Sequence, residues 1–339
     1  MRVLLIGSGD VGNIGSFFVD ALKSLGHEQY FIESEYIKDR SSLFHKIASR
    51  LIGRRPITYW KTNREVRETV RRIRPRITLI TKGQWISPDT LKQAKNEKTC
   101  LVNYATDDPF NLNVSSSDLI EGIPFYDLYV CTKRAIMDEV QQAGCQKVVY
   151  VPFAYEPKLH FPERPSAGEE AKRFSSDVVF VGAADRDRLP IMRKLVAGPW
   201  QLNLYGGFWN RDRQLKNYYR GFVLGRDYRL VLGGAKVCLG LVRRANRDGH
   251  SMRSFEIPAC GAFMLAERSD EHLEFFKEDK EAAYFGSDEE LLSKVRYYLS
   301  HEAERRRIAC AGYQRVITGK NTYQDRLATM LQYAKELLK

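Results

Sequence analysis

Short apolar segments alternate along this chain with longer stretches that have the spacing of amphipathic helices. In the first half we expect strands at 2–6, 29–32, 77–81, 100–104, 128–131 and 148–151, and helices that include 14–25 and 135–143. In the second half we expect strands at 178–181, 201–205, 235–241, 262–265 and 283–285. Strands that alternate with helices of about 10–15 residues form parallel sheets with helices on both faces. The alternation therefore predicts an α/β protein with two Rossmann-like, doubly wound domains that face a central cleft.

The length of the chain agrees with two domains. A chain of 339 residues exceeds the size at which a single hydrophobic core stops growing. Between 156 and 172, polar residues and prolines interrupt every periodic pattern, so we expect the interdomain linker there. The first domain then covers 1–155 and the second begins at 173. Ligands of such sheets bind outside the carboxyl ends of the strands, which makes the loops after the strands the candidate site.

Composition and cysteine spacing narrow the class of protein. No apolar run reaches the roughly 20 residues of a membrane-spanning helix, and the N-terminal apolar stretch is too short for a signal peptide. The six cysteines contain no C-x-x-C pair, which excludes a disulfide scaffold and gives no sign of a structural zinc site. We therefore expect a cytoplasmic protein with reduced thiols.

Positive charge is concentrated in one part of the first domain. The whole chain has 54 Lys and Arg against 42 Asp and Glu, a formal charge of +12, and the region 38–76 is strongly basic. Within it, residues 43–55 have the apolar spacing of a helix with Arg50, Arg54 and Arg55 on or near the other face. Two interpretations stay open, a surface helix that packs on the core, and a peripheral contact with an anionic membrane at its inner face. Nucleic-acid binding is not expected because no DNA- or RNA-binding motif accompanies the charge.

A glycine-rich motif follows the first expected strand. Gly7-Ser8-Gly9-Asp10-Val11-Gly12 has the G-x-G-x-x-G spacing, which lets backbone approach a pyrophosphate at a helix N-terminus. Glu33 or Glu35 then follows the second strand, where a ribose hydroxyl would bind. This motif predicts a cofactor loop at Gly9 and Asp10 if the chain is an NAD(P)-dependent oxidoreductase. The same turn also opens α/β proteins with other functions because a tight strand–helix connection itself requires glycine.

An acidic pair follows the first strand of the second domain. Asp185-Arg186-Asp187 resembles the D-x-D that binds a metal in some sugar transferases, and paired carboxylates are able to bind a divalent cation. Here Arg186 and Arg188 neutralise the two acids. We therefore predict a salt-bridged loop and no metal site.

The segment 246–261 is the strongest candidate for a ligand site. We expect Ser251 to cap a short helix over 252–260 that Gly261 terminates. The start of that helix, with flexible Gly249 before it and Arg253 in its first turn, is suited to a diphosphate. Glu256 lies one turn further, within reach of a ribose. The alternative is a solvated Arg253–Glu256 pair. The apolar residues around Glu256 instead favour a buried helix, in which a carboxylate usually has a functional role.

At these residues the chain resembles a known family. Asp248, seven residues and Glu256 are similar to the donor-site signature of retaining GT-B glycosyltransferases of the glycosyl transferases group 1 type, with Asp248 where that signature has Glu. The run 252–261 looks like the spore-maturation (CgeB-like) group of these enzymes. Further patterns of that group follow in the expected order, namely Asp107-Asp108-Pro109-Phe110, Pro152–Pro157, Val179–Gly182, Leu204–Gly207 and Asn321–Leu327. The resemblance covers nearly the whole chain.

The resemblance implies a fold and a function. It implies a GT-B fold with an acceptor-side domain at 1–155, a donor domain at 173–320 and a helix at 321–339 that crosses back to the first domain. The substrate would be a UDP- or GDP-sugar, with no cofactor or metal required. The following residues would contact this donor: Gly182, Arg186, Arg188, Gly249, His250, Ser251, Met252 and Glu256. Asp248 and Arg253 would act in catalysis, with Arg253 stabilising the leaving diphosphate.

The acceptor side is less defined. The loop with Gly9 and Asp10 would line it, and an inverting reaction would need Asp107, Asp108 or Asp10 as the base. A retaining course is expected from the resemblance. The acceptor is left open as a small molecule, a glycan, a lipid-linked molecule or a protein. Two other functions stay open, an NAD(P)-dependent oxidoreductase and a nucleotide-sugar binding protein without turnover.

Overall fold

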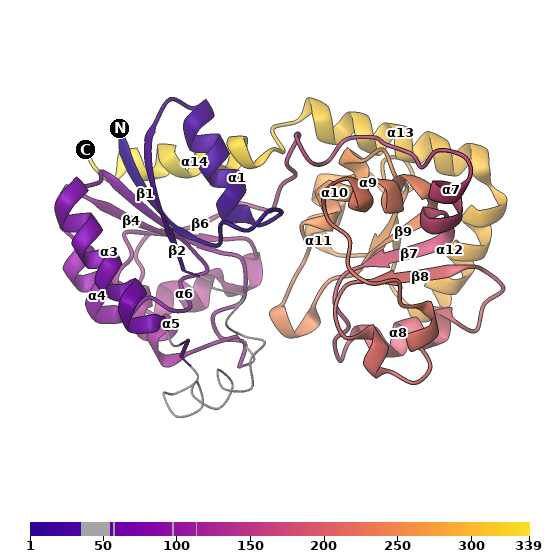
Figure 1. Cartoon of the computed structure of the whole chain (residues 1–339), viewed down its shortest axis with the longest axis horizontal. Coiled ribbons are helices and arrows are strands. Elements are labelled where there is room, and N and C mark those ends of the chain that lie inside the picture. The colour runs from indigo at the N-terminus through magenta and orange to yellow at the C-terminus, as the bar shows by residue number, and fades with distance from the viewer. Residues whose placement is uncertain (35–54, 57, 97, 113) are drawn as a thin grey trace. The chain divides into compact units, whose positions relative to one another are not determined.

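The computed structural model describes residues 1–34, 55–56, 58–96, 98–112 and 114–339. The chain folds into two compact units, drawn in Figure 1. Unit 1 comprises Met1–Pro152 and Tyr323–Lys339, and unit 2 comprises Phe153–Thr322. The stretch 156–172, expected as a linker, therefore belongs to unit 2, and the last helix, α14 (Tyr323–Glu336), belongs to unit 1.

Unit 1 contains a six-stranded sheet in which every pair of neighbours is parallel. The strand order is β2-β1-β3-β4-β5-β6, for β1 (Arg2–Gly7), β2 (Glu28–Glu33), β3 (Ile77–Thr81), β4 (Cys100–Ala105), β5 (Leu128–Cys131) and β6 (Val148–Tyr150). Every residue of β3, β4 and β5 is buried. Continuous apolar strands are typical of a sheet with both faces covered.

Helices provide that cover in unit 1. In the described part of this unit they are α1 (Ile14–Ser24), α3 (Tyr59–Ile73), α4 (Pro88–Ala94), α5 (Ser117–Gly122), α6 (Met137–Gln142) and α14. Helix α1 packs against α14, where Phe17 stacks on Tyr323 with ring centroids 5.0 Å apart. Helix α4 contacts both α3 and α5 (Figure 1). The predicted doubly wound architecture is thus confirmed in this unit.

Unit 2 contains a second parallel sheet, of five strands. Its order is β11-β10-β9-β7-β8, for β7 (Ser176–Val181), β8 (Leu202–Tyr205), β9 (Ala235–Gly240), β10 (Met264–Glu267) and β11 (Ala283–Phe285). Its helices are α7 (Glu169–Phe174), α8 (Arg188–Leu195), α9 (Gly225–Gly234), α10 (Arg253–Ala259), α11 (Asp270–Phe275), α12 (Asp288–Ser300) and α13 (Glu302–Thr318). From β7 the chain adds β8 on one side of the sheet and then β9 on the other. A ligand of such a sheet binds where this direction changes, at the carboxyl ends of β7 and β9.

One expected strand begins later than its apolar residues indicate. Residues 262–265 were expected to form it, but β10 runs from Met264 to Glu267. Gly261 adopts φ +68°, and the amide of Ala262 donates back to Ile257. This left-handed turn ends α10 and uses Ala262 as part of its C-cap, which delays the strand. No helix among the described residues is long and apolar enough to cross a membrane.

Candidate functional site

Gly182 lies at the carboxyl end of β7, at the position where the fold predicts a ligand. Its amide donates to the carbonyl of Tyr205 (2.8 Å), and its carbonyl accepts from the indole of Trp209 (2.8 Å). A side chain here has no room, because a Cβ would lie 2.8 Å from Cζ of Phe180 and 3.5 Å from Nη1 of Arg253. The end of β7 therefore exposes backbone without a side chain, next to the guanidinium of Arg253.

Two arginines converge on the ring of Phe180. The guanidinium carbon of Arg188 lies 5.1 Å from the ring centroid and that of Arg253 lies 5.5 Å from it, within the range of cation–π attraction. Arg188 starts α8 and Arg253 starts α10. The structure thus brings together two positive charges that the sequence separates by many residues.

The two guanidinium groups are only partly paired. Arg188 is 3% exposed, donates to the carbonyls of Ala183 (3.1 Å) and Leu241 (3.4 Å), and lies 3.2 Å from a carboxylate oxygen of Asp185. Burial, with the nearby charge of Arg253, lowers the pKa of Arg188 to about 10. The Nε atoms of both arginines are buried without a hydrogen-bond partner among the described residues. An anion at this position would neutralise the repulsion and accept these hydrogen bonds.

In the Asp185-Arg186-Asp187 loop, the ion pair between Asp185 and Arg188 agrees with the prediction, whereas the prediction for Arg186 is not tested. Asp185 accepts from the amides of Asp187 and Arg188, and Asp187 accepts from the amide of Ala245. Arg186 is exposed and lines a pocket of about 470 Å³ in unit 2 together with Phe208 and Arg211. Among the described residues no group of His, Cys, Asp and Glu is arranged to bind a metal.

Asp248 folds the loop that precedes α10. Its carboxylate accepts from the side chain of Asn246 (2.8 Å) and the amide of Arg243 (3.3 Å), and the Arg243 guanidinium lies 3.9 Å away. The side chain is 4% exposed. The adjoining Gly249 packs so closely on Glu271 that an added Cβ would lie 2.6 Å from its Cδ. Both residues therefore fix the path of the loop.

His250 is fully buried, and both of its ring nitrogens contact protein groups. Nε2 accepts from the amide of Phe153 (3.0 Å), so Nδ1 carries the hydrogen and faces Glu271 at 2.5 Å. The ring packs edge-on against Phe153 and Phe275. This arrangement joins the loop to two other segments of unit 2.

The start of α10 differs from the expectation. The N-cap is Met252, in helical conformation and without a side-chain hydrogen bond, so the prediction that Ser251 caps the helix is wrong. Ser251 instead donates its amide to Oγ of Ser254 (3.1 Å), while its own hydroxyl is buried with no partner in the described structure. The amide of Ser254, which a Ser251 cap would bind, donates to the backbone carbonyl of Ser251 (3.0 Å).

Glu256 is buried in the first turn of α10, at 7% exposure. Its Oε2 accepts from the phenol of Tyr228 (2.7 Å), and its Oε1 lies 3.7 Å from Nε2 of His160. Burial lowers the pKa of His160, and the charge of Glu256 opposes that shift. The alternative of a solvated Arg253–Glu256 pair is therefore excluded. No pattern in the sequence pointed to Tyr228 or His160 as neighbours of this carboxylate, since both lie far from it along the chain.

The remaining predicted residues lie in unit 1. The amide of Gly9 donates to the carboxylate of Glu33 (2.8 Å), and Asp10 is exposed. This pairing puts a negative charge on the amide that a pyrophosphate would use in a dinucleotide enzyme, which argues against that interpretation. Glu35 lies outside the described residues.

Asp107 and Asp108 follow β4. A carboxylate oxygen of Asp107 lies 3.9 Å from Nζ of Lys82, whereas Asp108 is 2% exposed and accepts from the amide of Phe110 (2.9 Å). Asp107 is thus the more accessible of the two acids.

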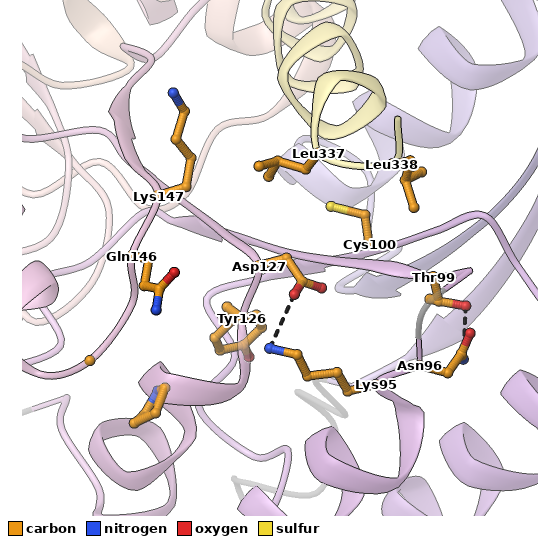
Figure 2. A pocket seen from close by; sticks show the side chains of 12 residues that line it. Lys95, Asn96, Thr99, Cys100, Tyr126, Asp127, Gln146, Lys147, Leu337 and Leu338 are labelled. Carbon is orange, nitrogen blue, oxygen red and sulfur yellow. Dashed lines mark hydrogen bonds and ion pairs between the residues drawn. The ribbon is translucent and has the colours of Figure 1, made fainter.

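A further pocket in unit 1 contains none of the predicted residues. It has a volume of about 800 Å³ and lies at the amino ends of β4, β5 and β6, where Cys100, Asp127 and Lys147 line it (Figure 2). Lys95 pairs there with Asp127 at 3.1 Å. The predicted site residues Gly9 and Asp10 follow β1 instead, and Asp107 and Asp108 follow β4.

Comparison with known proteins supports the GT-B assignment of the fold. Residues 184–332 match a family model described as glycosyl transferase-like. No curated protein matches the chain.

Solved structures are similar over nearly the full length. Sucrose-phosphate synthase from Thermosynechococcus elongatus has a TM-score of 0.68 at 14% identity, with 99% of each chain covered. Anabaena HepE in complex with UDP-glucose has a TM-score of 0.64 at 14% identity, covering 100% of this chain and 99% of that one. A glycosyltransferase from Rickettsia africae has a TM-score of 0.63 at 15% identity, covering 100% and 98%. The two units together therefore have the GT-B fold.

Proposed function

We propose that this chain is a glycosyltransferase that transfers a sugar from a nucleoside-diphosphate sugar to an acceptor. The observation that carries the proposal is the pair of guanidinium groups of Arg188 and Arg253 on the Phe180 ring, each with a buried Nε that lacks a partner among the described residues. Both arginines belong to the segment that matches the glycosyl transferase-like model. A diphosphate supplies the charge and the acceptor atoms that this pair lacks.

The donor in this proposal is a UDP- or GDP-sugar bound to unit 2. Its diphosphate lies on the backbone of Gly182, where no side chain fits, and accepts hydrogen bonds from Arg188 and Arg253. Glu256 accepts from the ribose, while Tyr228 orients the carboxylate. The complexes of HepE with UDP and with UDP-glucose favour the uridine donor.

The chemistry follows from the positions of these charges. When the glycosidic bond breaks, negative charge develops on the leaving diphosphate, and fixed guanidinium groups stabilise it without a reorganisation step. Two such groups perform the task that a divalent cation performs in other transferases, so we propose a reaction that requires no metal. Asp248 contributes by folding the loop before α10.

We further propose a retaining hexosyltransferase of the CgeB-like group. This rests on the resemblance of the 252–261 run and on the spacing of Asp248 and Glu256. In a retaining reaction the donor phosphate receives the acceptor proton, so unit 1 need not supply a base. If the reaction inverts, Asp107 is the better base because Asp108 is buried and already accepts from Phe110.

We propose that the basic surface of unit 1 contacts an anionic membrane at its inner face. This location implies a cytoplasmic enzyme. Residues 43–54 of the predicted membrane helix lie outside the described residues, and the Arg55 guanidinium makes two hydrogen bonds to Asp118, at 2.7 and 2.9 Å. Helix α3 presents the described basic surface. Trp60 is 57% exposed at its start, and exposed Lys61, Arg64, Arg71 and Arg72 follow. An aromatic beside cations is typical of interfacial binding.

Co-sedimentation with vesicles tests the membrane contact. We expect binding to vesicles that contain phosphatidylglycerol, none to pure phosphatidylcholine, and weaker binding after Arg71→Gln with Arg72→Gln. The matched change Arg306→Gln with Arg307→Gln on α13 should leave binding unchanged. Equal binding to both kinds of vesicle would refute an electrostatic contact.

Calorimetry on the full chain tests the nucleotide site. We expect UDP or GDP to bind, Arg253→Ala and Glu256→Ala to weaken that binding, and Gly9→Ala to leave it unchanged. Binding of NADH, lost in Gly9→Ala alone, would favour the oxidoreductase instead. Release of UDP from UDP-glucose in the presence of EDTA separates a metal-independent enzyme from a binding protein without turnover, and NMR of the product anomer decides the stereochemical course.

A further inference from the structure

The turn that begins α11 makes three contacts, two with the loop before α10 and one with the first turn of α10. The hydroxyl of Ser269 donates to the carbonyl of Gly249 (2.5 Å). The carboxylate of Glu271 accepts from Nδ1 of His250 (2.5 Å). Nε2 of His272 accepts from the hydroxyl of Ser254 (2.7 Å). We call Ser269, Glu271 and His272 the 269–272 turn.

These contacts are buried and directional. Ser254, His250 and His272 are 0% exposed, and Glu271 is 7% exposed. Nδ1 of His272 lies 2.7 Å from the carbonyl of Glu267 and must donate to it, so Nε2 is left as the acceptor for Ser254. Each buried group therefore has a fixed role, and loss of a hydrogen bond between two of them is costly in a low-dielectric interior.

Close packing reinforces the hydrogen bonds. A Cβ on Gly249 would lie between 2.6 and 2.9 Å from three side-chain atoms of Glu271. The loop is thus in van der Waals contact with the same residue that accepts from His250. Glycine is the residue that permits this approach.

The contacts extend to the residues proposed to bind the donor. Oγ of Ser254 also accepts from the amide of Ser251 (3.1 Å), which fixes the backbone on both sides of Arg253. Arg253, the residue before Ser254, contacts the ring of Phe180, and Glu256 follows about one turn later in α10. A rigid supporting contact of this kind sets how precisely a binding residue is oriented.

We infer that Ser269, Glu271 and His272 are positioning residues that pre-organise the 249–254 loop, and through it Arg253 and Glu256, for the nucleoside diphosphate. The identity of the ligand in this inference rests on the proposed function. The contacts between the 269–272 turn and residues 249–254 do not depend on it. The three residues touch no donor atom themselves. Loss of the Ser269 hydroxyl acts through the loop, so it weakens nucleotide binding and leaves the fold of unit 2 in place.

Ser269→Ala and Ser287→Ala form a matched pair for the test. Ser269 caps α11 by accepting from His272, and Ser287 caps α12 by accepting from Glu290. Both changes remove a helix cap, but Ser269→Ala also removes the hydrogen bond to Gly249. We expect calorimetry to give a dissociation constant for UDP about tenfold higher in Ser269→Ala than in Ser287→Ala, with similar unfolding temperatures. Ser269→Thr, which keeps the hydroxyl, should restore binding.

Amide hydrogen exchange separates this inference from the proposed function. We expect the peptide that spans 249–254 to exchange faster in Ser269→Ala than in Ser287→Ala, with or without UDP. If the wild-type protein does not bind UDP but this difference in exchange is present, the proposed donor is wrong. The inference that the 269–272 turn orders residues 249–254 then still holds. Equal exchange and equal UDP affinity in the two variants would overturn the inference.

Discussion

The phenol of Tyr228 donates a 2.7 Å hydrogen bond to the carboxylate of Glu256, which is 7% exposed in the first turn of α10. Tyr228 comes from α9, so the contact joins two helices that cover the same sheet. Burial and the adjacent charge raise the pKa of this phenol well above its usual value. The phenol therefore stays protonated and donates to Oε2 of Glu256, while Oε1 of Glu256 lies 3.7 Å from Nε2 of His160.

Tyr228→Phe should weaken nucleotide binding more than it weakens the fold. The change removes the donor that orients Glu256 but keeps the ring, so we expect the dissociation constant for UDP to rise about fivefold to tenfold, equivalent to roughly 1 kcal/mol. Titration calorimetry measures this. Tyr313→Phe is the control, because Tyr313 is half-buried on α13, another helix of unit 2. An equal effect of both changes would mean that Tyr228 does not act through Glu256.

Replacement of Arg253 should mainly slow the chemical step. Its guanidinium lies on Phe180, and its buried Nε has no hydrogen-bond partner in the part of the chain that the structure describes. It is therefore available to stabilise charge on the leaving diphosphate. We expect Arg253→Ala to cost about 2–4 kcal/mol in kcat/KM for the donor sugar. Arg213→Ala, an exposed arginine on the same unit, should leave kcat/KM unchanged. A fall in kcat/KM carried wholly by KM would show that Arg253 binds the ground state only.

Gly182→Ala should disturb the ring on which both arginines lie. The added Cβ would lie 2.8 Å from Cζ of Phe180, and overpacking of this kind destabilises by about 1–3 kcal/mol. Gly207→Ala is the matched change, because the nearest atom to its Cβ lies 3.7 Å away. Chemical denaturation and UDP titration of the two variants should separate them. Similar stability and affinity in both would refute the close packing at Gly182.

Stability should depend on pH through His272. This ring is fully buried, and its burial lowers its pKa from 6.5 to about 4. The folded state therefore keeps His272 neutral while the unfolded chain takes up a proton below pH 6.5. The neutral His272 ring therefore contributes fully to the free energy of unfolding above pH 6.5, and this contribution is lost as the pH falls towards 4. At roughly 1.4 kcal/mol per pH unit, the loss is about 3 kcal/mol.

Denaturation at a series of pH values checks this expectation. We expect the difference in unfolding free energy between wild type and His272→Gln to shrink as the pH falls from 6.5 to 4. His301→Gln, a change at an exposed histidine, should leave the wild-type pH dependence intact. A constant difference between wild type and His272→Gln across this range would show that His272 is not the titrating group.

Several local features of the site were predictable from the sequence. The buried character of α10 followed from the apolar residues around Glu256, and Phe255 and Ile257 are each 1% exposed. The end of the helix at Gly261 followed from the left-handed turn that glycine favours. The cap at Ser251 was not predictable, because the N-cap lies one residue later, at Met252, and the Ser254 amide donates to the carbonyl of Ser251.

The sequence by itself determined the alternation of strands and helices, and with it two parallel sheets, because backbone periodicity and the burial of apolar faces are local properties of the chain. It also indicated which loops follow the strands. The tertiary structure decided which side chains meet there, including Arg188 with Arg253 on Phe180 and Tyr228 with Glu256. These contacts join residues that are remote along the chain, and only the order of the strands in the folded sheet brings them together.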